Sequence, residues 1–109
     1  MATSHTNLIK LSLIALSKND LATAWQNDTG VARSMTGDRV IKFGFKGSSD
    51  IIGITRTGKF LAVEIKTGKD DLRPEQKVFK KVIEENGGKY FLIRNEDEIE
   101  NMIWRLKYE

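Results

Sequence analysis

Three charged residues stand out because they border or interrupt apolar segments in the middle of the chain. Asp50 opens the apolar segment that runs to Thr55, and Glu64 and Lys66 lie within the apolar segment that begins at Phe60. Alternate residues of a strand point to the same face, so Glu64 and Lys66 would share one face of their strand. This pattern predicts either a surface ion pair, worth about 0–1 kcal/mol, or a group of catalytic residues.

The turn between the two segments sets how they pair. Residues 56–58, Arg-Thr-Gly, fit a three-residue hairpin loop, because such a loop favours positive φ at its third position and glycine adopts it freely. Thr55 would then face Lys59, and Asp50 would face Glu64. Residues directly opposite each other in an antiparallel pair have β-carbons ~4.5–5.5 Å apart. The sequence therefore predicts two adjacent carboxylates, an arrangement that is repulsive and raises a carboxyl pKa.

A divalent cation would relieve this repulsion. Carboxylate oxygens suit Mg²⁺ or Mn²⁺, whose coordination is completed by water and a substrate phosphate. We expect Asp50 and Glu64 to be metal ligands, with the backbone carbonyl of Ile65 as a further one. Such a cation activates water and neutralises charge that grows on a phosphate. Lys66, one strand step further, would orient or deprotonate that water or stabilise the transition state.

The elements that position these groups follow from hydrophobic periodicity and turn residues. Helices are predicted over residues 8–16, from Pro74 to the glycines at 87–88, and from the cap residue Asn95 through Leu106; strands are predicted over residues 40–45, 50–55, 60–66 and 90–93. Residues 19–39 are less regular, with Trp25 as a buried anchor and a turn at 27–30. The last two strands should be parallel, since a helix connects them. The predicted fold class is α/β, a mixed β-sheet in α-β-β-β-α-β-α order flanked by helices.

Length and composition limit the classes of protein that this chain can belong to. Its 109 residues and 12.4 kDa predict one domain over residues 1–109. The absence of cysteine excludes disulfides, thiolate zinc sites and cysteine nucleophiles, and a single histidine, His5, excludes a His-based triad. No apolar run approaches the roughly 18 residues that span a bilayer, so we expect a cytoplasmic protein with no membrane partner. The net charge of +3 is compatible with nucleic-acid binding.

One segment matches the start of a nucleotide-binding loop by coincidence. Residues 53–59 have its glycine and lysine spacing, but Phe60 replaces the Ser or Thr that would hold magnesium. The segment also predicts a hairpin, whereas that loop joins a strand to a helix. We therefore expect no nucleotide cofactor.

The motifs around the three charged residues resemble those of the VRR-NUC family, the virus-type replication–repair nucleases of the PD-(D/E)XK superfamily. The resemblance rests on Gly-Ser-Ser-Asp-Ile-Ile-Gly at 47–53, Phe-Leu-Ala-Val-Glu-Ile-Lys-Thr at 60–67, Pro-Glu-Gln at 74–76 with Phe79, Gly-Gly at 87–88 and, more weakly, Trp-Gln-Asn-Asp-Thr-Gly at 25–30. It extends from about Leu8 to Ile103. The acid and Glu-x-Lys alone are a short motif, and the later glutamine and glycine pair make the match more specific.

The resemblance implies a restriction-endonuclease-like fold and a Mg²⁺- or Mn²⁺-dependent DNA endonuclease. By position, Asp50 and Glu64 would be metal ligands, Lys66 the catalytic lysine, and Gln76 a glutamine that supports the site. Family members without other domains suggest a homodimer that cuts branched, flap or four-way junction DNA in viral or phage-type replication or repair, in the host cytoplasm if viral. Backbone phosphates would be contacted by basic side chains, for which the candidates are Lys42, Lys46, Lys69, Arg73 and Lys77.

Two departures from the family pattern leave alternatives open. Many relatives carry an acid on the first helix, but here nothing acidic precedes Asp20, so His5, Asn7 or no residue takes its place. Arg73 stands before the helix where relatives often have a small cap, and it would contact phosphate instead. The missing acid supports an alternative, a non-catalytic DNA-binding module that keeps the nuclease fold. A nuclease acting on RNA or on linear DNA ends would share the same active site.

Overall fold

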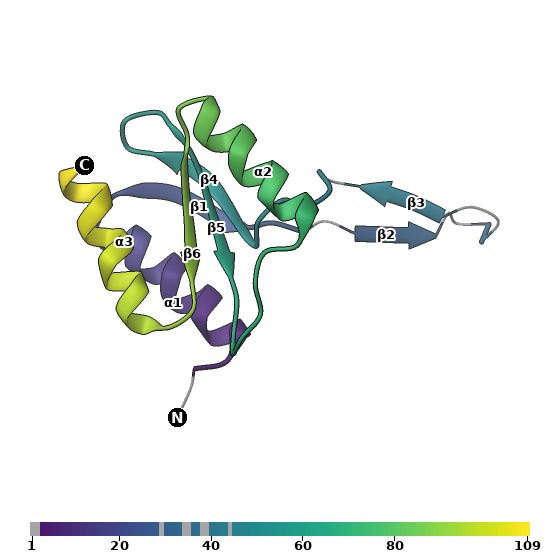
Figure 1. Cartoon of the computed structure of the whole chain (residues 1–109), viewed down its shortest axis with the longest axis horizontal. Helices are drawn as coiled ribbons and strands as arrows, with labels where there is room; N and C mark the ends of the chain where they lie inside the picture. Colours follow the sequence, from purple (N-terminus) through teal and green to yellow (C-terminus); the bar gives the residue numbers. More distant parts are fainter. Residues whose placement is uncertain (1–2, 29, 34–35, 38–39, 44) are drawn as a thin grey trace.

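A four-stranded mixed β-sheet forms the centre of the structure, with helices on both of its faces (Figure 1). The computed structural model describes residues 3–28, 30–33, 36–37, 40–43 and 45–109, and the side chains of residues 30–33 and 40–43 lie outside that description. The elements are α1 (His5–Lys18), β1 (Ala22–Gln26), β2 (Gly30–Arg33), β3 (Val40–Phe43), β4 (Ile51–Thr55), β5 (Phe60–Ile65), α2 (Pro74–Glu85), β6 (Lys89–Ile93) and α3 (Glu96–Tyr108).

The sheet has the strand order β1-β4-β5-β6. β4 runs antiparallel to both β1 and β5, and β6 runs parallel to β5, which confirms the predicted strand–helix–strand unit. β2 and β3 form a separate antiparallel pair that extends away from the rest of the molecule (Figure 1). The mixed sheet flanked by helices confirms the predicted α/β, restriction-endonuclease-like fold class.

The predicted order of elements was incomplete, because β1 and β2 lie in the segment that looked irregular. β1 reads Ala-Thr-Ala-Trp-Gln, which has no run of β-branched residues, so its strand conformation comes from pairing with β4. The prediction that Trp25 is buried is wrong, since its side chain is 50% exposed. Trp25 pairs with Ile52 at the edge of the sheet, whereas α2 packs over Ala62 and Tyr90, on the two strands beyond β4.

Parts of two further predictions lie outside the described residues. β3 covers the first four residues of the predicted strand at 40–45, Gly44 is outside the description, and Phe45 is 55% exposed. The prediction that one face of this strand is covered concerns side chains that are not described. The turn predicted at 27–30 includes Thr29, which is also outside the description.

Capping residues fix where the helices begin. α1 begins at His5, three residues before the predicted start, and the hydroxyl of its cap residue Ser4 accepts a hydrogen bond from the Asn7 N–H at 3.2 Å. α2 begins at Pro74 as predicted, because proline suits the first helical position. Asn95 caps α3 as predicted and accepts a hydrogen bond from the Glu98 N–H at 3.0 Å.

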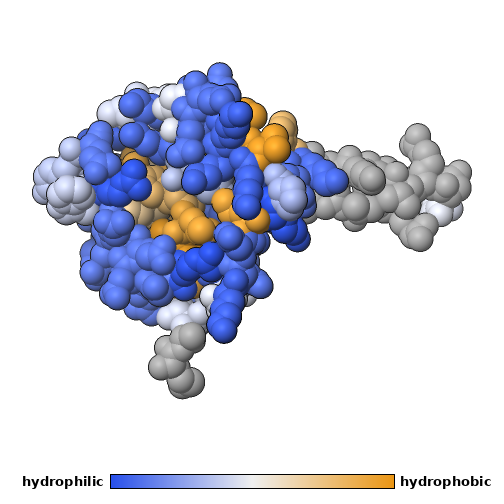
Figure 2. All heavy atoms as spheres, in the orientation of Figure 1, coloured by the Kyte–Doolittle hydropathy of each residue, from blue (hydrophilic) through white to orange (hydrophobic). Residues whose placement is uncertain are grey.

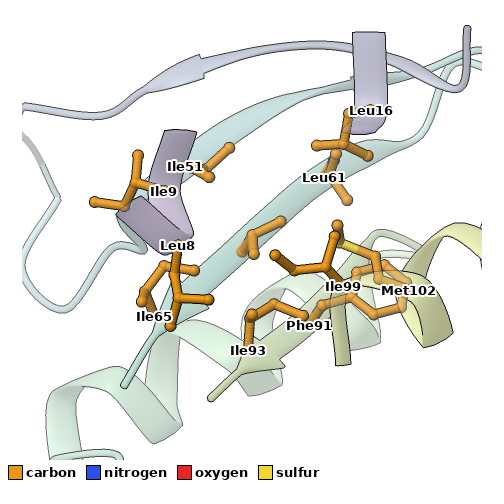
Figure 3. Packing of buried hydrophobic residues seen from close by; sticks show 11 residues of the cluster. Leu8, Ile9, Leu16, Ile51, Leu61, Ile65, Phe91, Ile93, Ile99 and Met102 are labelled. Carbon is orange, nitrogen blue, oxygen red and sulfur yellow. The ribbon is translucent and has the colours of Figure 1, made fainter. Parts of the chain in front are cut away.

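The larger part of the core lies between the sheet and helices α1 and α3 (Figure 3). Leu8 and Leu16 of α1, Ile65 and Ile93 of the sheet, and Met102 of α3 are each at most 1% exposed. The opposite face of the sheet packs against α2 through a smaller cluster that contains Ala62, Phe79, Ile83 and Tyr90. The two faces of β5 are therefore both covered, and a charged side chain on this strand must lie in a protected environment.

The hairpin register determines which residues of β4 and β5 meet. Ile51 pairs with Val63 and Ile54 pairs with Phe60, and the Thr55 N–H donates a hydrogen bond to the Lys59 carbonyl at 2.8 Å. This is the register that the three-residue loop predicted. Gly58 has a φ of +85°, the conformation for which glycine was expected there.

Hydrophilic residues cover most of the face of the molecule shown in Figure 2. Hydrophobic residues are visible in a hollow between α2 and α3, where Leu72, Leu92 and Met102 help to line a pocket of about 290 Å³. Within the described ranges, no helix has both the length and the apolar character needed to cross a bilayer.

Candidate active site

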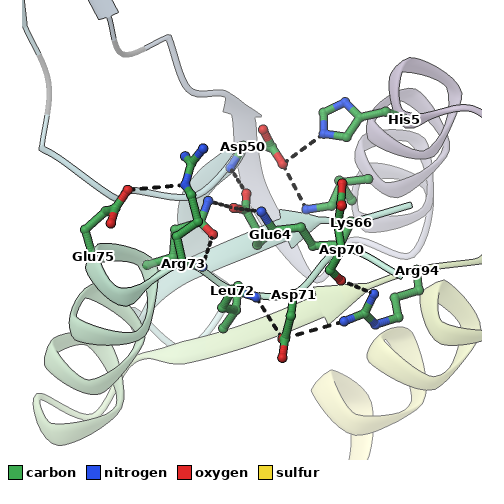
Figure 4. A network of polar contacts seen from close by, with 12 residues as sticks. His5, Asp50, Glu64, Lys66, Asp70, Asp71, Leu72, Arg73, Glu75 and Arg94 are labelled. Carbon is green, nitrogen blue, oxygen red and sulfur yellow. Dashed lines mark hydrogen bonds and ion pairs between the residues drawn. The ribbon is translucent and has the colours of Figure 1, made fainter. Parts of the chain in front are cut away.

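Asp50 and Glu64 lie side by side where β4 begins and β5 ends (Figure 4). The backbone N–H of Asp50 donates a hydrogen bond to Oε1 of Glu64 at 3.1 Å. The backbone N–H of Ile65 donates to Oδ2 of Asp50 at 2.9 Å. Each carboxylate is thus held by the backbone of the opposite strand, which fixes both side chains in the arrangement that the register predicted.

The environment of Glu64 favours its neutral form. Glu64 is only 3% exposed. Burial, a hydrogen bond with the Asp50 side chain and the charge of Asp50 together raise the pKa of Glu64 from 4.5 to about 8, and the charge of Lys66 opposes this rise. Near neutral pH without a cation, Glu64 is therefore mostly protonated, and the repulsion between the two carboxylates is largely avoided.

Lys66 follows directly after β5 and points toward Glu64. Its Nζ lies 3.9 Å from Oε2 of Glu64, and its side chain is 13% exposed. The Lys66 backbone N–H donates to the Ile93 carbonyl at 3.1 Å, which continues the pairing of β5 with β6. The lysine is thus fixed at its backbone while its ammonium group remains close to the two carboxylates.

Gln76 connects the first turn of α2 to Glu64. Its Nε2 donates a hydrogen bond to Oε2 of Glu64 at 2.5 Å, and its Oε1 accepts one from the Arg73 backbone N–H at 2.8 Å. Because both ends of the amide are bonded, its orientation is determined, and the side chain is 4% exposed. Gln76 is therefore a buried residue that contacts the site rather than an exposed residue of the helix.

The loop before Asp50 is held by contacts that the sequence analysis did not foresee. Asn27 donates from Nδ2 to the Ser48 hydroxyl at 2.8 Å and to the Ser49 carbonyl at 3.0 Å. Gly47 has a φ of +82°, and a β-carbon there would lie 2.3 Å from the carbonyl oxygen of Glu75 in α2. In the sequence, Asn27 is marked only by the turn predicted at residues 27–30 and by the weakly matching stretch at residues 25–30.

Of the two residues considered in place of a first-helix acid, His5 is the one that contacts the site. Its Nε2 lies 3.4 Å from Oδ2 of Asp50, and its side chain is 46% exposed. Asn7 is exposed and has no side-chain hydrogen bond to the site among the described contacts. The first residue of α1 therefore lies beside Asp50.

The basic residues expected to bind DNA border this site or lie outside the description. Lys46 is in the loop before Asp50, Lys69 is in the loop after β5, and Lys77 is in α2; all three are exposed. Arg73 is also exposed, with its guanidinium Nε 3.2 Å from Oε1 of Glu75. Lys42 belongs to β3, but its side chain is not described.

The metal-binding capacity of the site rests on two carboxylates. In the part of the chain that the structure describes, no three His, Cys, Asp or Glu side chains form a group that could hold a metal ion. Mg²⁺, however, is commonly held by one or two carboxylates together with water and substrate phosphates. The hard oxygen donors of Asp50 and Glu64 fit that mode of binding.

A family comparison agrees with this geometry. A model of the VRR-NUC domain matches residues 17–97, which are 81 of the 109 residues. The chain belongs to the VRR-NUC domain family. It is therefore a nuclease-type domain, and the match includes Asp50, Glu64, Lys66 and Gln76 but not His5. Comparison with curated proteins gives no match.

Proposed function

We propose that this VRR-NUC domain is a Mg²⁺- or Mn²⁺-dependent endonuclease that hydrolyses phosphodiester bonds in DNA. The observation that carries the proposal is the joint placement of Asp50 and Glu64, each bonded to the opposite strand, with Lys66 and Gln76 directed at Glu64. A structural role alone does not explain why a carboxyl group as deeply buried as Glu64 adjoins a second acid, since burial and that neighbour both disfavour its ionised form.

Asp50 and Glu64 would hold the cation, with the Ile65 carbonyl as a further donor. The bound cation would supply an activated water and neutralise charge on the phosphate. The raised pKa of Glu64 supports this assignment, because the pair carries a proton where a cation would otherwise balance its charge. Gln76 keeps Oε2 of Glu64 oriented through an amide that is itself fixed by Arg73.

Lys66 is the residue that we propose to act directly on the reacting groups. Its ammonium group lies near the carboxylates but points from the end of a strand, so it can reach a phosphate oxygen or a water bound beside them. Lysine can stabilise negative charge on the phosphate or transfer a proton there. Exposed cations around the site, Lys46, Lys69, Arg73 and Lys77, would bind backbone phosphates without reading sequence.

We include branched DNA and a two-fold dimer in the proposal. A single small domain offers limited surface for gripping a junction, and a second copy would double it. Ile14 of α1 and Trp104 of α3 are 59% and 54% exposed, so apolar side chains on these two helices are available to a second copy of the chain. Measuring the molar mass in solution by light scattering tests the dimer separately from the activity.

A cleavage assay on labelled single-stranded, duplex, flap and four-way junction DNA, with Mg²⁺ or Mn²⁺, tests the nuclease. We expect metal-dependent cutting that disappears in Lys66→Ala, and the preferred DNA identifies the substrate class. Binding to the same DNAs without any cutting would instead indicate the non-catalytic DNA-binding module. A labelled RNA of matching sequence serves as the control for the type of sugar.

A further inference from the structure

The loop at residues 67–73 joins the end of β5 to the start of α2. Because β5 and α2 both carry residues of the candidate active site, this β5–α2 loop borders the site. Lys69 lies near its middle and is exposed, and no ion pair or hydrogen bond of its ammonium group is found among the described residues. The next two residues, Asp70 and Asp71, are acids, which a DNA backbone repels. Binding of DNA by this loop therefore depends on which side chains it presents to the substrate.

Arg94, the first residue after β6, holds this loop through both of its terminal nitrogens (Figure 4). Nη1 donates a hydrogen bond to the carbonyl of Asp70, and Nη2 lies 3.7 Å from Oδ1 of Asp71. A guanidinium group presents its donors in a rigid planar fork. Two adjacent residues of the loop are therefore fixed in position and orientation relative to β6.

The two contacts of Arg94 differ in what they contribute. The side chain of Asp71 is 74% exposed and that of Arg94 is 30% exposed, and ion pairs in contact with solvent contribute little to stability. The bond to Asp70 instead joins a charged donor to a backbone carbonyl, and bonds with a charged partner are stronger than neutral ones. The main consequence of Arg94 is therefore the position of the Asp70 backbone.

Lys69 lies inside a turn that ends at Asp70. The backbone N–H of Asp70 donates to the Thr67 carbonyl at 3.3 Å, and Gly68 has a φ of +60°, which glycine adopts without strain. The four residues thus form one tight turn, and its last carbonyl is the one that Arg94 binds. Fixing that carbonyl fixes the turn and, with it, the direction in which the Lys69 side chain leaves the loop.

The two ends of the loop are held without Arg94. At the start, the Lys66 backbone N–H donates to the Ile93 carbonyl at 3.1 Å, and at the end the Arg73 backbone N–H donates to Oε1 of Gln76 at 2.8 Å. Loss of the guanidinium therefore releases the middle of the loop, while the lysine and the glutamine of the candidate site keep contacts of their own. A role in positioning the loop can thus be separated from a role in folding.

We propose that Arg94 is a positioning residue that holds Lys69 in place to bind a backbone phosphate of DNA beside the candidate active site. This inference rests on the proposed function, in which Lys69 is one of the cations that contact DNA. Arg94 acts through the Asp70 carbonyl and does not contact DNA itself, because both of its terminal nitrogens are bound to the loop. Lysine cannot replace it, since a single ammonium group does not reproduce the fork.

The test is a double-mutant cycle that combines Arg94→Lys with Lys69→Gln. The first change keeps the charge and removes the fork, and the second removes the cation that the fork would position. A matched cycle combines Arg94→Lys with Lys77→Gln, an exposed cation on α2 outside the loop. Fluorescence anisotropy on a labelled 30-base-pair duplex, without divalent metal and across a salt series, measures the affinity of each variant for DNA.

Arg94→Lys should behave as if one phosphate contact were lost. Each such contact contributes ~0.9 to the slope of log K against log salt, which corresponds to roughly 5–10-fold weaker binding at about 0.1 M salt. In the Lys69→Gln background the same change should cause no further loss. In the Lys77→Gln background it should cause the full loss, because independent sites are additive. Hydrogen exchange of the amides at 67–71 should become faster in Arg94→Lys.

Three results would overturn the role of Arg94 while leaving a DNA-cutting protein intact. They are wild-type affinity in Arg94→Lys, an equal loss in the Lys69→Gln and Lys77→Gln backgrounds, and unchanged hydrogen exchange in the loop. The first would mean that charge alone suffices, and the second that Arg94 acts independently of Lys69. A wild-type protein that neither binds nor cuts DNA would overturn the nuclease proposal and this one with it.

Discussion

The two ends of the β4–β5 hairpin differ in charge and in how their charged side chains are held. At one end Asp50 and Glu64 are fixed by hydrogen bonds from the facing strand, and Glu64 is almost completely buried. At the other end Lys59 is exposed, and its ammonium group has no partner among the described residues. Directed bonds therefore fix the atoms at the acidic end, whereas only net charge is provided at the basic end. Substitutions should have steep effects at the first and shallow, salt-dependent effects at the second.

The largest effect is expected from Lys66→Ala. The variant should lose about 10²–10⁴-fold in the rate of DNA cleavage, because it removes the ammonium group that lies beside Glu64. Binding of DNA and of Mn²⁺ should persist, and single-turnover rates together with equilibrium binding measure these quantities separately. Lys10→Ala, an exposed position on α1, is the matched control. Cleavage at the wild-type rate in Lys66→Ala would contradict the assignment of the site.

Two glycine substitutions, one at each end of the β4–β5 hairpin, compare how much each end contributes to the free energy of unfolding. Gly47 and Gly58 both have positive φ, but a β-carbon on Gly47 meets the Glu75 backbone at 2.3 Å, whereas one on Gly58 meets nothing within 4 Å. Gly47→Ala should therefore cost about 3 kcal/mol or more of unfolding free energy, and Gly58→Ala about 1 kcal/mol. Urea denaturation measures both, and equal costs would show that α2 does not press on the loop before Asp50.

Gln76→Ala should reduce cleavage about 10–100-fold while the fold is retained. The variant leaves Glu64 without the amide donor that orients Oε2. Val78→Ala, a 58% exposed position on the same helix, controls for the change in helix composition. Comparing cleavage rates with circular dichroism separates loss of the site from loss of the helix. An unchanged rate of cleavage would show that Gln76 has only a structural role.

The smallest effect is expected on the free energy of unfolding of the metal-free protein, which should depend on pH through Glu64. Because the pKa of Glu64 is about 8 in the fold and 4.5 as the unperturbed value, folding favours its protonated form. The contribution of Glu64 to stability is complete below pH 4.5 and is lost as the pH rises through 8, with a slope of at most about 1.4 kcal/mol per pH unit. Glu64→Gln should remove this decline and be the more stable protein at pH 8. Chemical denaturation at several pH values without metal measures it, and parallel curves for the two proteins would contradict it.

Local sequence signals predicted the elements that carry the site, because each has a strong cap, turn or periodic pattern. The turn at residues 56–58 determined the register of β4 and β5, and with it the meeting of Asp50 and Glu64. Pro74 and Asn95 marked the starts of their helices. Gln76 and Phe79 are three residues apart in α2 and so share a helical face, and both side chains are buried.

Features that depend on long-range pairing could not be predicted in the same way. β1 has weak strand propensity of its own and is a strand because β4 offers it hydrogen bonds. The exposure of Trp25 depends on how far α2 reaches across the sheet, which no local pattern encodes. Whether His5 or Asn7 meets the site depends on where α1 begins, and Ser4 settles that by capping the helix just before His5.

The amide of Gln76 connects the backbone of Arg73 to the side chain of Glu64. The backbone N–H of Arg73 donates to the amide oxygen, and the amide nitrogen donates to Glu64. Gln76 therefore links the backbone of Arg73 to the carboxylate of Glu64 through two hydrogen bonds. The guanidinium of Arg73 is exposed to solvent at the start of α2. If Arg73 binds a backbone phosphate as we propose, a shift of its backbone would reach Oε2 of Glu64 through the Gln76 amide. Contact with DNA at the start of α2 and the orientation of the Glu64 carboxylate would then change together.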